Sequence, residues 1–475
     1  MSDGDYDVIV LGGGFSGMAA ATRLAAFGLR VLLCESNPVR LGGLNTWYER
    51  GGRVLDTGLH AVTNYVPPTE AAAPLNRVLR QLRIRRDDLR LMPQRQSRIL
   101  FPGCELRLTN DFAEFTAQVE RLFPADAEGF RGLVEEIRRY GYSTVPLPCQ
   151  SSEAVLKRHI SSELLRSMLR MPVMYYGNPR LGDMEFSAFA TMFRSVVMEG
   201  FARPAGGMKE FLSVVARRLE ASGATVRLGC TVSRILVGKD GRANGVETTR
   251  GETLHARRLV STIGAFETGR LCGASAPTRL ATIPPGEAGF FEAILELPKK
   301  PAEYGLEDAI LFCCDSGDFK FEPPENPLMV ESMLVCAPGN YPGCGEAEAR
   351  LLRLSTITSP KDWFNTGTEK YQRAKAMLAD AMKGFLDKIA PKIRQDARLV
   401  DCFTPKTVQG WTGHENGAIY GAPVKLPDFD SGMPGLSVAG TDQGLLGIVG
   451  SMLSGILAAN TLLAEEMREN DTGAL

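Results

Sequence analysis

The sequence predicts an α/β protein in which a Rossmann-like nucleotide-binding domain is interwoven with a second domain made of a sheet and helices. In residues 7–35 an apolar run, a glycine-rich turn, a helical pattern and a second apolar run follow one another. Short β-type runs between turns occupy residues 224–264, and residues 435–467 return to a strand followed by a long helix. The simplest arrangement has the block at 224–264 rejoin the sheet that begins at residue 7.

The N-terminal stretch is a complete βαβ unit with a dinucleotide fingerprint. Its glycines permit a tight turn close to a pyrophosphate, and the helix that opens there directs N–H groups and a positive dipole end at the phosphate. Glu35 ends the second strand, 18 residues after Gly17, where a carboxylate can accept hydrogen bonds from an adenosine ribose. The unit therefore predicts FAD or NAD(P) binding rather than a plain turn. The residues expected at the cofactor are Gly12, Gly14, Phe15, Ser16, Gly17, Glu35 and Ser36.

A second glycine pair favours FAD. Gly42 and Gly43 stand between Arg40 and Leu44, just past the ribose acid. An extended flavin cofactor needs the chain to pass closely along it, and glycine removes the Cβ atoms that would block this approach. Surface turns are the alternative explanation for these glycines.

Composition excludes several classes of function. The 475 residues carry a formal net charge of −1 and no Lys/Arg-rich tract, so no nucleic-acid partner is expected. The ten cysteines form no Cys-x-x-Cys pair and the four histidines lack ligand spacing, so no metal site is expected. The acidic start is unlike a signal peptide, and no run of 18 apolar residues predicts a membrane span. The expected location is the cytoplasm.

The remaining chain predicts the substrate domain. Residues 66–200 are rich in helix formers, and 271–429 mix β-type runs with a helix, so these two ranges are expected to form that domain with a helical cap. Residues 1–65, 201–270 and 430–475 are expected to form the FAD-binding domain. Met and aromatic residues gather between Leu164 and Phe193, which suits either plain core or a pliable apolar pocket.

Four separated segments resemble the FAD-dependent phytoene desaturase-like oxidoreductases, within the wider flavin amine oxidase superfamily. They span nearly the whole chain in the family's order, and the resemblance implies a GR2-type flavoprotein fold. The segments are Gly12–Gly17 with Glu35, Arg40 and Gly42–Gly43; Arg203–Gly207 leading to Val232; Thr404–Pro405 with Gly417–Gly421; and Ala439–Asp442 with Gly450–Gly455.

The resemblance implies further cofactor contacts. Val232 would bond the adenine through its backbone, Arg40 would lie along the cofactor, and Asp442 would contact the ribitol or phosphate. Backbone N–H groups of Gly447–Ser451 would face the pyrimidine edge of the flavin, where a helix N-terminus stabilises the negative charge of the reduced ring. The residues expected there are Val232, Gly264, Gly440, Asp442, Gly447, Ile448, Val449 and Ser451.

Leu44 and His60 stand out beside the second glycine pair. The family places Arg after the glycine pair, where this chain has Leu44, so Arg40 or Arg53 would have to replace that guanidinium. His60 ends an Asp56-x-Gly-x-His stretch like one in squalene-pathway members of the family. It is either a catalytic acid–base group or a buried histidine bonded to a carbonyl.

The resemblance implies hydride transfer at flavin N5 with a long apolar isoprenoid, by a desaturase, saturase, isomerase or dehydroxylase of the carotenoid or squalene type. An amine oxidase acting on a small amine is the alternative, and a non-catalytic flavoprotein is a third possibility. A water-insoluble substrate also predicts peripheral membrane contact, with docking expected in residues 66–200. The sequence assigns no redox partner.

Overall fold

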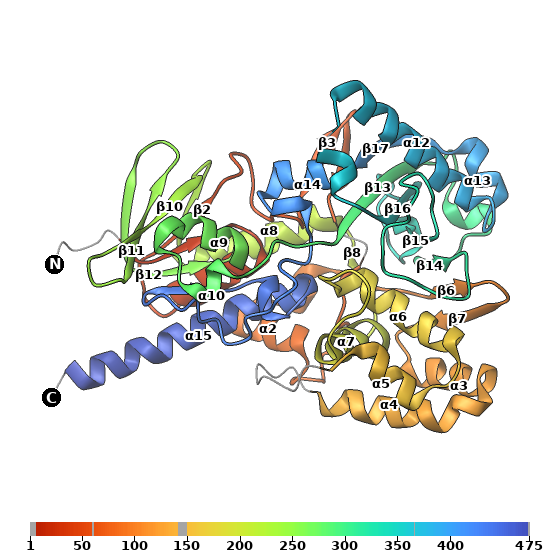
Figure 1. Cartoon of the computed structure of the whole chain (residues 1–475), viewed down its shortest axis with the longest axis horizontal. Coiled ribbons are helices and arrows are strands. Elements are labelled where there is room, and N and C mark those ends of the chain that lie inside the picture. Colours follow the sequence, from red (N-terminus) through yellow and green to blue (C-terminus); the bar gives the residue numbers. More distant parts are fainter. Residues whose placement is uncertain (1–5, 59–60, 141–149, 365, 474–475) are drawn as a thin grey trace.

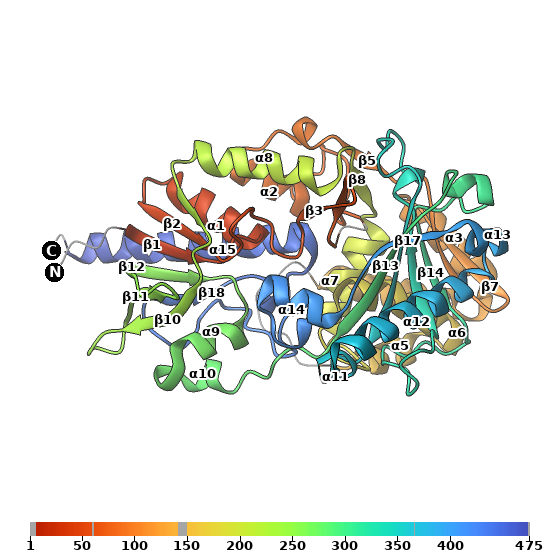
Figure 2. The same cartoon turned by 90° about the horizontal axis from the view of Figure 1, so that it is seen from above.

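The computed structural model describes residues 6–58, 61–140, 150–364 and 366–473. They form two lobes that lie side by side, each built around a sheet (Figure 1). A view from above shows the same separation, with the C-terminal helix running along the first lobe to its outer end (Figure 2). The predicted α/β class is confirmed.

The first lobe contains a seven-stranded sheet in the order β10-β11-β12-β1-β2-β9, with β18 beside β12. The central strands β12, β1, β2 and β9 run parallel, and β10–β11–β12 form an antiparallel edge. The strands are β1 (Tyr6–Leu11), β2 (Val31–Glu35), β9 (Thr225–Leu228), β10 (Val232–Val237), β11 (Ala243–Thr248), β12 (Thr253–Ser261) and β18 (Leu436–Val438). The block at 224–264 and the C-terminal segment therefore rejoin the sheet that begins with β1.

Alternate residues of the first sheet enter two different cores. Val8 and Val10 of β1 pack with helices on one face, whereas Ile9 and Leu11 pack with residues of α9, β10 and β11 on the other. This follows from the period of two along a strand, and burial of both faces explains why these strands are continuously apolar. The helices of the lobe are α1 (Phe15–Ala25), α2 (Pro74–Leu82), α8 (Gly207–Ala221), α9 (Ala265–Cys272), α10 (Thr278–Ala281) and α15 (Gly447–Gly473).

The second lobe contains another seven-stranded sheet, in the order β17-β13-β16-β15-β14-β6-β7. Its β14–β6 pair is parallel, and the other pairs are antiparallel. The strands are β6 (Ser97–Phe101), β7 (Cys104–Leu108), β13 (Gly289–Glu296), β14 (Ile310–Cys314), β15 (Ser332–Cys336), β16 (Leu351–Thr358) and β17 (Arg398–Phe403). Two small ribbons, β3 (Trp47–Arg50) with β4 (Arg53–Asp56) and β5 (Leu91–Pro93) with β8 (Ala202–Pro204), lie outside both sheets.

Helices cover both faces of the second sheet. One face packs on α12 and its neighbours, through Leu378, Met382 and Phe385. The other face packs on the segment between residues 112 and 198, which supplies the helical cap. The cap helices are α3 (Phe112–Leu122), α4 (Ala127–Arg139), α5 (Ser152–His159), α6 (Glu163–Gly177) and α7 (Phe186–Phe193). The remaining helices are α11 (Lys361–Phe364), α12 (Thr368–Leu386), α13 (Pro391–Asp396) and α14 (Pro405–Thr412).

The Met-rich segment of α6 is mainly core. Met168, Met171 and Met174 are each fully buried in the cluster that joins the cap to the sheet. At the C-terminal end of α6, Tyr176 keeps partial exposure. The adaptable methionines therefore fill the interior, and only the last turn of α6 reaches toward the first lobe.

The C-terminal helix α15 is the one described helix that is long and apolar enough to cross a membrane by length and composition, over Gly447–Arg468. Of that window, 56% is buried, and the helix packs along α1 and α2. A Cβ on Gly455 would lie 2.0 Å from the carbonyl oxygen of Ser16, so glycine is needed for this close approach. These contacts are typical of a core helix.

Candidate functional site

The first glycine turn leaves an open space in front of α1. A Cβ on Gly14 would meet no atom within 4 Å, whereas one on Gly17 would lie 1.9 Å from the carbonyl oxygen of Gly12. Gly12 itself has a φ of +94°, which L side chains rarely adopt. Gly12 and Gly17 thus shape the turn, and Gly14 faces the space that a pyrophosphate needs.

The N-terminus of α1 offers unpaired donors to this space. No side chain caps the helix at Gly14, so its first N–H groups have no side-chain partner at the N-cap. The hydroxyl of Ser16 is buried and has no hydrogen-bond partner in the part of the chain that the structure describes. Phe15 is fixed by an edge-to-face contact with Phe211, at 5.3 Å between ring centres. An orphaned hydroxyl and free N–H groups suit a phosphate of FAD.

Glu35 closes one side of the same space. Its Oε2 accepts a hydrogen bond from the N–H of Gly13 at 2.7 Å, and its Oε1 accepts one from Asn37 at 2.7 Å and one from Ser36 Oγ at 3.2 Å. The side chain is 7% exposed. The carboxylate is therefore held in one orientation at the end of β2, as the ribose interpretation requires.

Arg40 lies flat on an aromatic ring beside the second glycine pair. Its guanidinium carbon is 3.9 Å from the ring centre of Trp47, and the ammonium of Lys209 lies 4.3 Å from the same ring. A Cβ on Gly43 would come 3.6 Å from the Cα of Gly14, so the two glycine turns face one another. This places two cations near the expected phosphates.

Leu44 and Arg53 both form hydrogen bonds within the protein. The carbonyl of Leu44 accepts a hydrogen bond from the hydroxyl of Thr57 at 2.6 Å. Arg53 donates to both carboxylate oxygens of Glu296, at 2.8 and 2.9 Å. Since Arg53 is engaged by β13 of the second sheet, Arg40 is the better replacement for the missing family arginine.

Asp442 joins three segments of the chain behind the site. Its Oδ2 accepts from the N–H of Ala265 at 2.5 Å, its Oδ1 accepts from Ala422 at 2.8 Å, and Nζ of Lys425 lies 3.6 Å away. The carboxylate is 1% exposed. In this arrangement Asp442 organises the loops, and its predicted contact with FAD remains a prediction.

The loops that follow β12 and β18 lie against the first glycine turn. The hydroxyl of Thr262 donates to the carbonyl of Leu11 at 2.8 Å, and a Cβ on Gly440 would lie 3.5 Å from the carbonyl of Thr262. Gly264 and Gly440 both have positive φ, at 107° and 115°. The parallel strands β1, β12 and β18 therefore have their carboxyl ends at the same edge of the sheet. Ligands of open α/β sheets bind at this edge.

The N-terminus of α15 forms the other end of the site. The helix begins at Gly447, and the orphan N–H groups of its first turn include those of Ile448 and Val449, with Ser451 one turn on. A Cβ on Gly447 would lie 3.5 Å from Thr63 Oγ1. Val232 lies at the opposite end, where β10 begins opposite Thr248. His60 lies outside the residues that the structure describes, so its predicted role stays a prediction.

A pair of residues near the site, His414 and Glu267, was not predicted from the sequence. Nδ1 of His414 lies 3.6 Å from Oε1 of Glu267, and its Cε1 lies 3.5 Å from a Cβ built on Gly264. Burial opposes protonation, but the hydrogen bond and charge of Glu267 raise the pKa of His414 above its usual value. The two residues are 147 positions apart, so no local pattern could have paired them.

A buried lysine was also missed. Nζ of Lys425 donates to the carbonyl of Tyr420 at 2.7 Å and faces Asp442. Burial lowers its pKa, against the attraction of Asp442. Lys425 therefore connects the carboxylate of Asp442 to the backbone of Tyr420.

Aromatic side chains from the second lobe gather next to the start of α15. Phe290 lies 5.9 Å from Tyr175 and 5.9 Å from Tyr420 between ring centres, and Phe321 lies 6.0 Å from Tyr175. The hydroxyl of Tyr420 donates to the carbonyl of Tyr175. A Cβ on Gly177 at the end of α6 would come 2.9 Å from Leu446, directly before α15. We call Tyr175, Phe290, Phe321 and Tyr420 the aromatic wall.

A buried ionic network connects the two lobes. Nη2 of Arg203 lies 2.7 Å from carboxylate oxygens of both Asp56 and Glu348, and its side chain is fully buried. Arg353 donates to the carbonyl of Asp56 at 2.7 Å. Burial and the charge of Glu348 raise the pKa of Asp56 to about 6, against the attraction of Arg203. This network fixes the end of β4 and the start of α8, which border the site.

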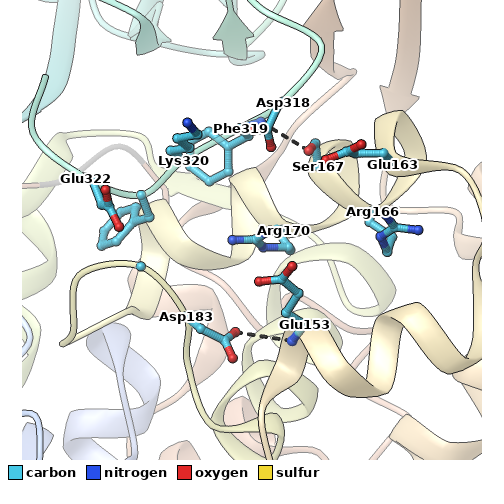
Figure 3. A pocket seen from close by; sticks show the side chains of 12 residues that line it. Glu153, Glu163, Arg166, Ser167, Arg170, Asp183, Asp318, Phe319, Lys320 and Glu322 are labelled. Atoms are coloured by element: carbon cyan, nitrogen blue, oxygen red, sulfur yellow. Dashed lines mark hydrogen bonds between the residues drawn. The ribbon is translucent and has the colours of Figure 1, made fainter.

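A separate cavity of about 380 Å³ opens on the other side of α6. Figure 3 shows Arg170 in its centre, with Glu153 and Asp183 from neighbouring elements around it. Most of its lining residues are charged, so this cavity does not suit a long apolar molecule. Phe319 and Phe321 separate it from Tyr175 of the aromatic wall.

Comparison with known proteins agrees with this geometry. Residues 15–463 match the model of the flavin containing amine oxidoreductase family. The chain is 23% identical to prolycopene isomerase 1 of an Oncidium hybrid cultivar, covering 97% of this chain and 84% of that protein. It is 25% identical to the neurosporene-forming phytoene desaturase of Rhodobacter capsulatus, over 56% of this chain and 54% of that protein. An oxidoreductase structure from Methanosarcina mazei shares the fold, with a TM-score of 0.69, 17% identity and coverage of 96% of this chain and all of that one.

Proposed function

This chain belongs to the flavin containing amine oxidoreductase family and is an FAD-dependent oxidoreductase, and we propose that its substrate is a long apolar isoprenoid of the carotenoid type. Bound FAD supplies hydride exchange at N5. The observation that carries the proposal is the aromatic wall, which places apolar rings next to the helix start expected at the flavin. Printed names of the relatives, prolycopene isomerase and phytoene desaturase, support the same substrate class.

The chain's own residues would position the reactants rather than react with them. Free N–H groups at the start of α15 suit the negative charge that a reduced flavin carries near its pyrimidine edge. The aromatic wall excludes water and orients a polyene across the ring. The ionic network around Arg203 and Asp56 would hold the second lobe in a fixed position relative to the lobe that binds the cofactor.

The test compares substrate classes on the purified flavoprotein without oxygen. Phytoene, prolycopene and squalene are added in detergent micelles to the oxidised and to the reduced protein, beside a panel of small amines. The visible flavin absorbance reports net reduction or oxidation, and chromatography of the isoprenoids reports isomerisation. Conversion of an isoprenoid without response to amines is expected. Bleaching of the flavin by amines alone would overturn the proposal in favour of an amine oxidase.

A matched pair of variants tests the wall itself. Phe290→Ala removes a ring of the aromatic wall, whereas Phe27→Ala removes a ring that is 58% exposed in the first lobe. Phe290→Ala is expected to raise KM for the isoprenoid about tenfold or more, because burial of an aromatic side chain contributes about 1.5–3 kcal/mol. Phe27→Ala is expected to leave KM unchanged.

We also propose that the substrate reaches the enzyme from a lipid surface. A water-insoluble polyene has negligible free concentration in water, so a protein that takes it from a bilayer needs an apolar contact there. In the described part of 66–200 the exposed large apolar side chains are Leu122, 39% exposed, and Leu181, 36% exposed.

A further inference from the structure

The charged cavity beside α6 holds an arginine without an ionic partner. The cavity measures about 380 Å³ and is lined by residues of α5, α6 and the segment that follows β14. Figure 3 shows Arg170 in the middle of these residues. In the part of the chain that the structure describes, its guanidinium forms no hydrogen bond or ion pair, although its Nε is buried. A buried donor without a partner is unfavourable, so the cavity favours a ligand that brings an anionic group to Arg170.

Two carboxylates of the cavity are engaged elsewhere. Oε1 of Glu153 lies 2.5 Å from Nζ of Lys157. The hydrogen bond from Lys157 lowers the pKa of Glu153, against burial, and the charge of Arg170 lowers it further. Asp183 accepts hydrogen bonds from Ser152 Oγ at 2.6 Å and from the N–H of Glu153 at 3.2 Å. Both carboxylates therefore hold the start of α5, and neither forms an ion pair with Arg170.

Three other carboxylates in the lining lack partners. The side chains of Glu163, Asp318 and Glu322 are exposed, and they form no hydrogen bond or ion pair with any residue that the structure describes. A primary ammonium group has three N–H donors, which suit such acceptors. Lys320 is a second cation in the lining. The cavity thus matches a ligand that carries an anionic group for Arg170 and an ammonium group for the acids.

We propose that this cavity binds the phosphoethanolamine headgroup of a phospholipid, with the phosphate at Arg170 and the ammonium group at the acids around Glu163. A guanidinium binds phosphate through two parallel, charge-assisted hydrogen bonds. A choline headgroup has no N–H donor and would leave the acids unpaired. Leu181, 36% exposed, directly precedes the lining residues Gly182 and Asp183, so an apolar side chain stands beside the cavity. The inference rests on the proposed uptake from a lipid surface and gives that surface a headgroup preference.

The cavity lies one layer of side chains away from the aromatic wall. The N–H of Phe319 donates to Ser167 Oγ at 3.1 Å, which joins the segment after β14 to α6. Phe319 and Phe321 line the cavity, and their ring centres lie 6.1 and 6.0 Å from that of Tyr175. A lipid headgroup held here would therefore place the bilayer surface close to the residues proposed to contact the isoprenoid.

The first experiment measures binding of the soluble headgroup. Glycerophosphoethanolamine is titrated into the purified holoprotein at low salt in a calorimeter. Glycerol phosphate, which lacks the ammonium group, and glycerophosphocholine, which lacks its N–H donors, are the comparison ligands. Saturable binding of glycerophosphoethanolamine is expected, about tenfold tighter than binding of either comparison ligand, because each of these loses charge-assisted hydrogen bonds.

Variants test the two halves of the cavity. Arg170→Met and Glu163→Gln should each weaken binding of glycerophosphoethanolamine about tenfold. Arg170→Lys keeps the charge but not the planar fork, and should bind with intermediate affinity. Arg138→Met is the control, since it removes an exposed arginine that pairs with Glu135 in α4, and it must keep the affinity of the wild type. Thermal unfolding of each variant checks the fold.

The second experiment measures sedimentation with phosphatidylcholine vesicles that contain or lack phosphatidylethanolamine. More wild-type protein should sediment with the vesicles that contain it, and Arg170→Met should lose this difference. Absence of saturable binding of glycerophosphoethanolamine, or equal affinities of the wild type and Arg170→Met, would overturn the headgroup site. Binding of the soluble compound without any preference among vesicles would assign the cavity to a free metabolite and overturn the lipid source. Equal sedimentation of the wild type with both kinds of vesicle would overturn the headgroup preference and leave uptake from a lipid surface standing, so the two proposals fail separately.

Discussion

His414 and Glu267 form a partly buried acid–base pair, 3.6 Å apart, at the edge of the cofactor site next to Gly264. The negative charge of Asp442 also raises the pKa of His414. The pair connects α9 to the loop after α14, because the N–H of Glu415 donates to Glu267 at 2.9 Å. Protonation of His414 therefore strengthens the contact between two segments that border the site.

This pair predicts a pH dependence of stability. The pKa of His414 is raised on folding, so its contribution is fully present below the unfolded value of 6.5 and is lost as pH rises through the higher folded value. His414→Gln removes the contribution. In urea unfolding, the difference in free energy between wild type and variant is expected to be largest near pH 6 and to shrink above it. A difference that is the same at every pH would contradict the pairing.

Gly14→Val should produce a colourless, folded protein. A side chain at Gly14 meets no protein atom within 4 Å, so it fills the cofactor space without disturbing the turn. Absorbance of the purified protein gives the flavin-to-protein ratio, and thermal unfolding of the apoproteins checks the fold. Gly410→Val is the control, since that position also faces open space but lies in α14. Full flavin occupancy in Gly14→Val would contradict the placement of the pyrophosphate.

Arg203→Met should destabilise the protein by about 3–5 kcal/mol, because it leaves the buried carboxylate of Asp56 and the partly buried one of Glu348 without their partner. Asp56 and Glu348 both lie 2.7 Å from this guanidinium. The control is Arg234→Met, which breaks an exposed pair with Glu247 and should change stability by less than about 1 kcal/mol. Denaturant unfolding measures both, and equal effects would show that the buried network does not stabilise the fold.

His60→Ala should lose about 10²–10⁴ in turnover while keeping FAD, if His60 transfers a proton to a departing oxygen. The comparison variant is His255→Ala, since His255 is exposed on β12. Single-turnover rates with the isoprenoid that the substrate screen identifies give the measurement. Turnover within a few-fold of wild type would assign His60 a structural role.

Leu122→Asp and Leu181→Asp should each lower the fraction of protein that sediments with liposomes. Burial of one such side chain in lipid contributes about 1.5–3 kcal/mol, and a charge there opposes it. Met329→Asp is the control, because Met329 is 51% exposed in the segment between β14 and β15, outside residues 66–200. If the wild type stays in the supernatant at every salt concentration, direct lipid docking is wrong.

The sequence by itself determined the α/β class, the flavoprotein family and the FAD cofactor, which are confirmed. The reason is that a glycine turn, a following helix and a strand-ending acid are local features, so the 7–35 segment shows them without any knowledge of the fold. The apolar runs at 224–264 and 435–467 likewise indicate strands and a helix through their own periodicity.

Only the tertiary structure decided which distant residues meet. Glu267 pairs with His414, Lys425 lies beside Asp442, and Asp56 pairs with Arg203. The structure also showed that Arg53 binds Glu296 and that the methionines of α6 fill the core. Such pairings depend on the order of strands and on which face each helix covers, and neither is written in a local pattern, because burial and charge pairing act between chain segments that only the completed fold brings together.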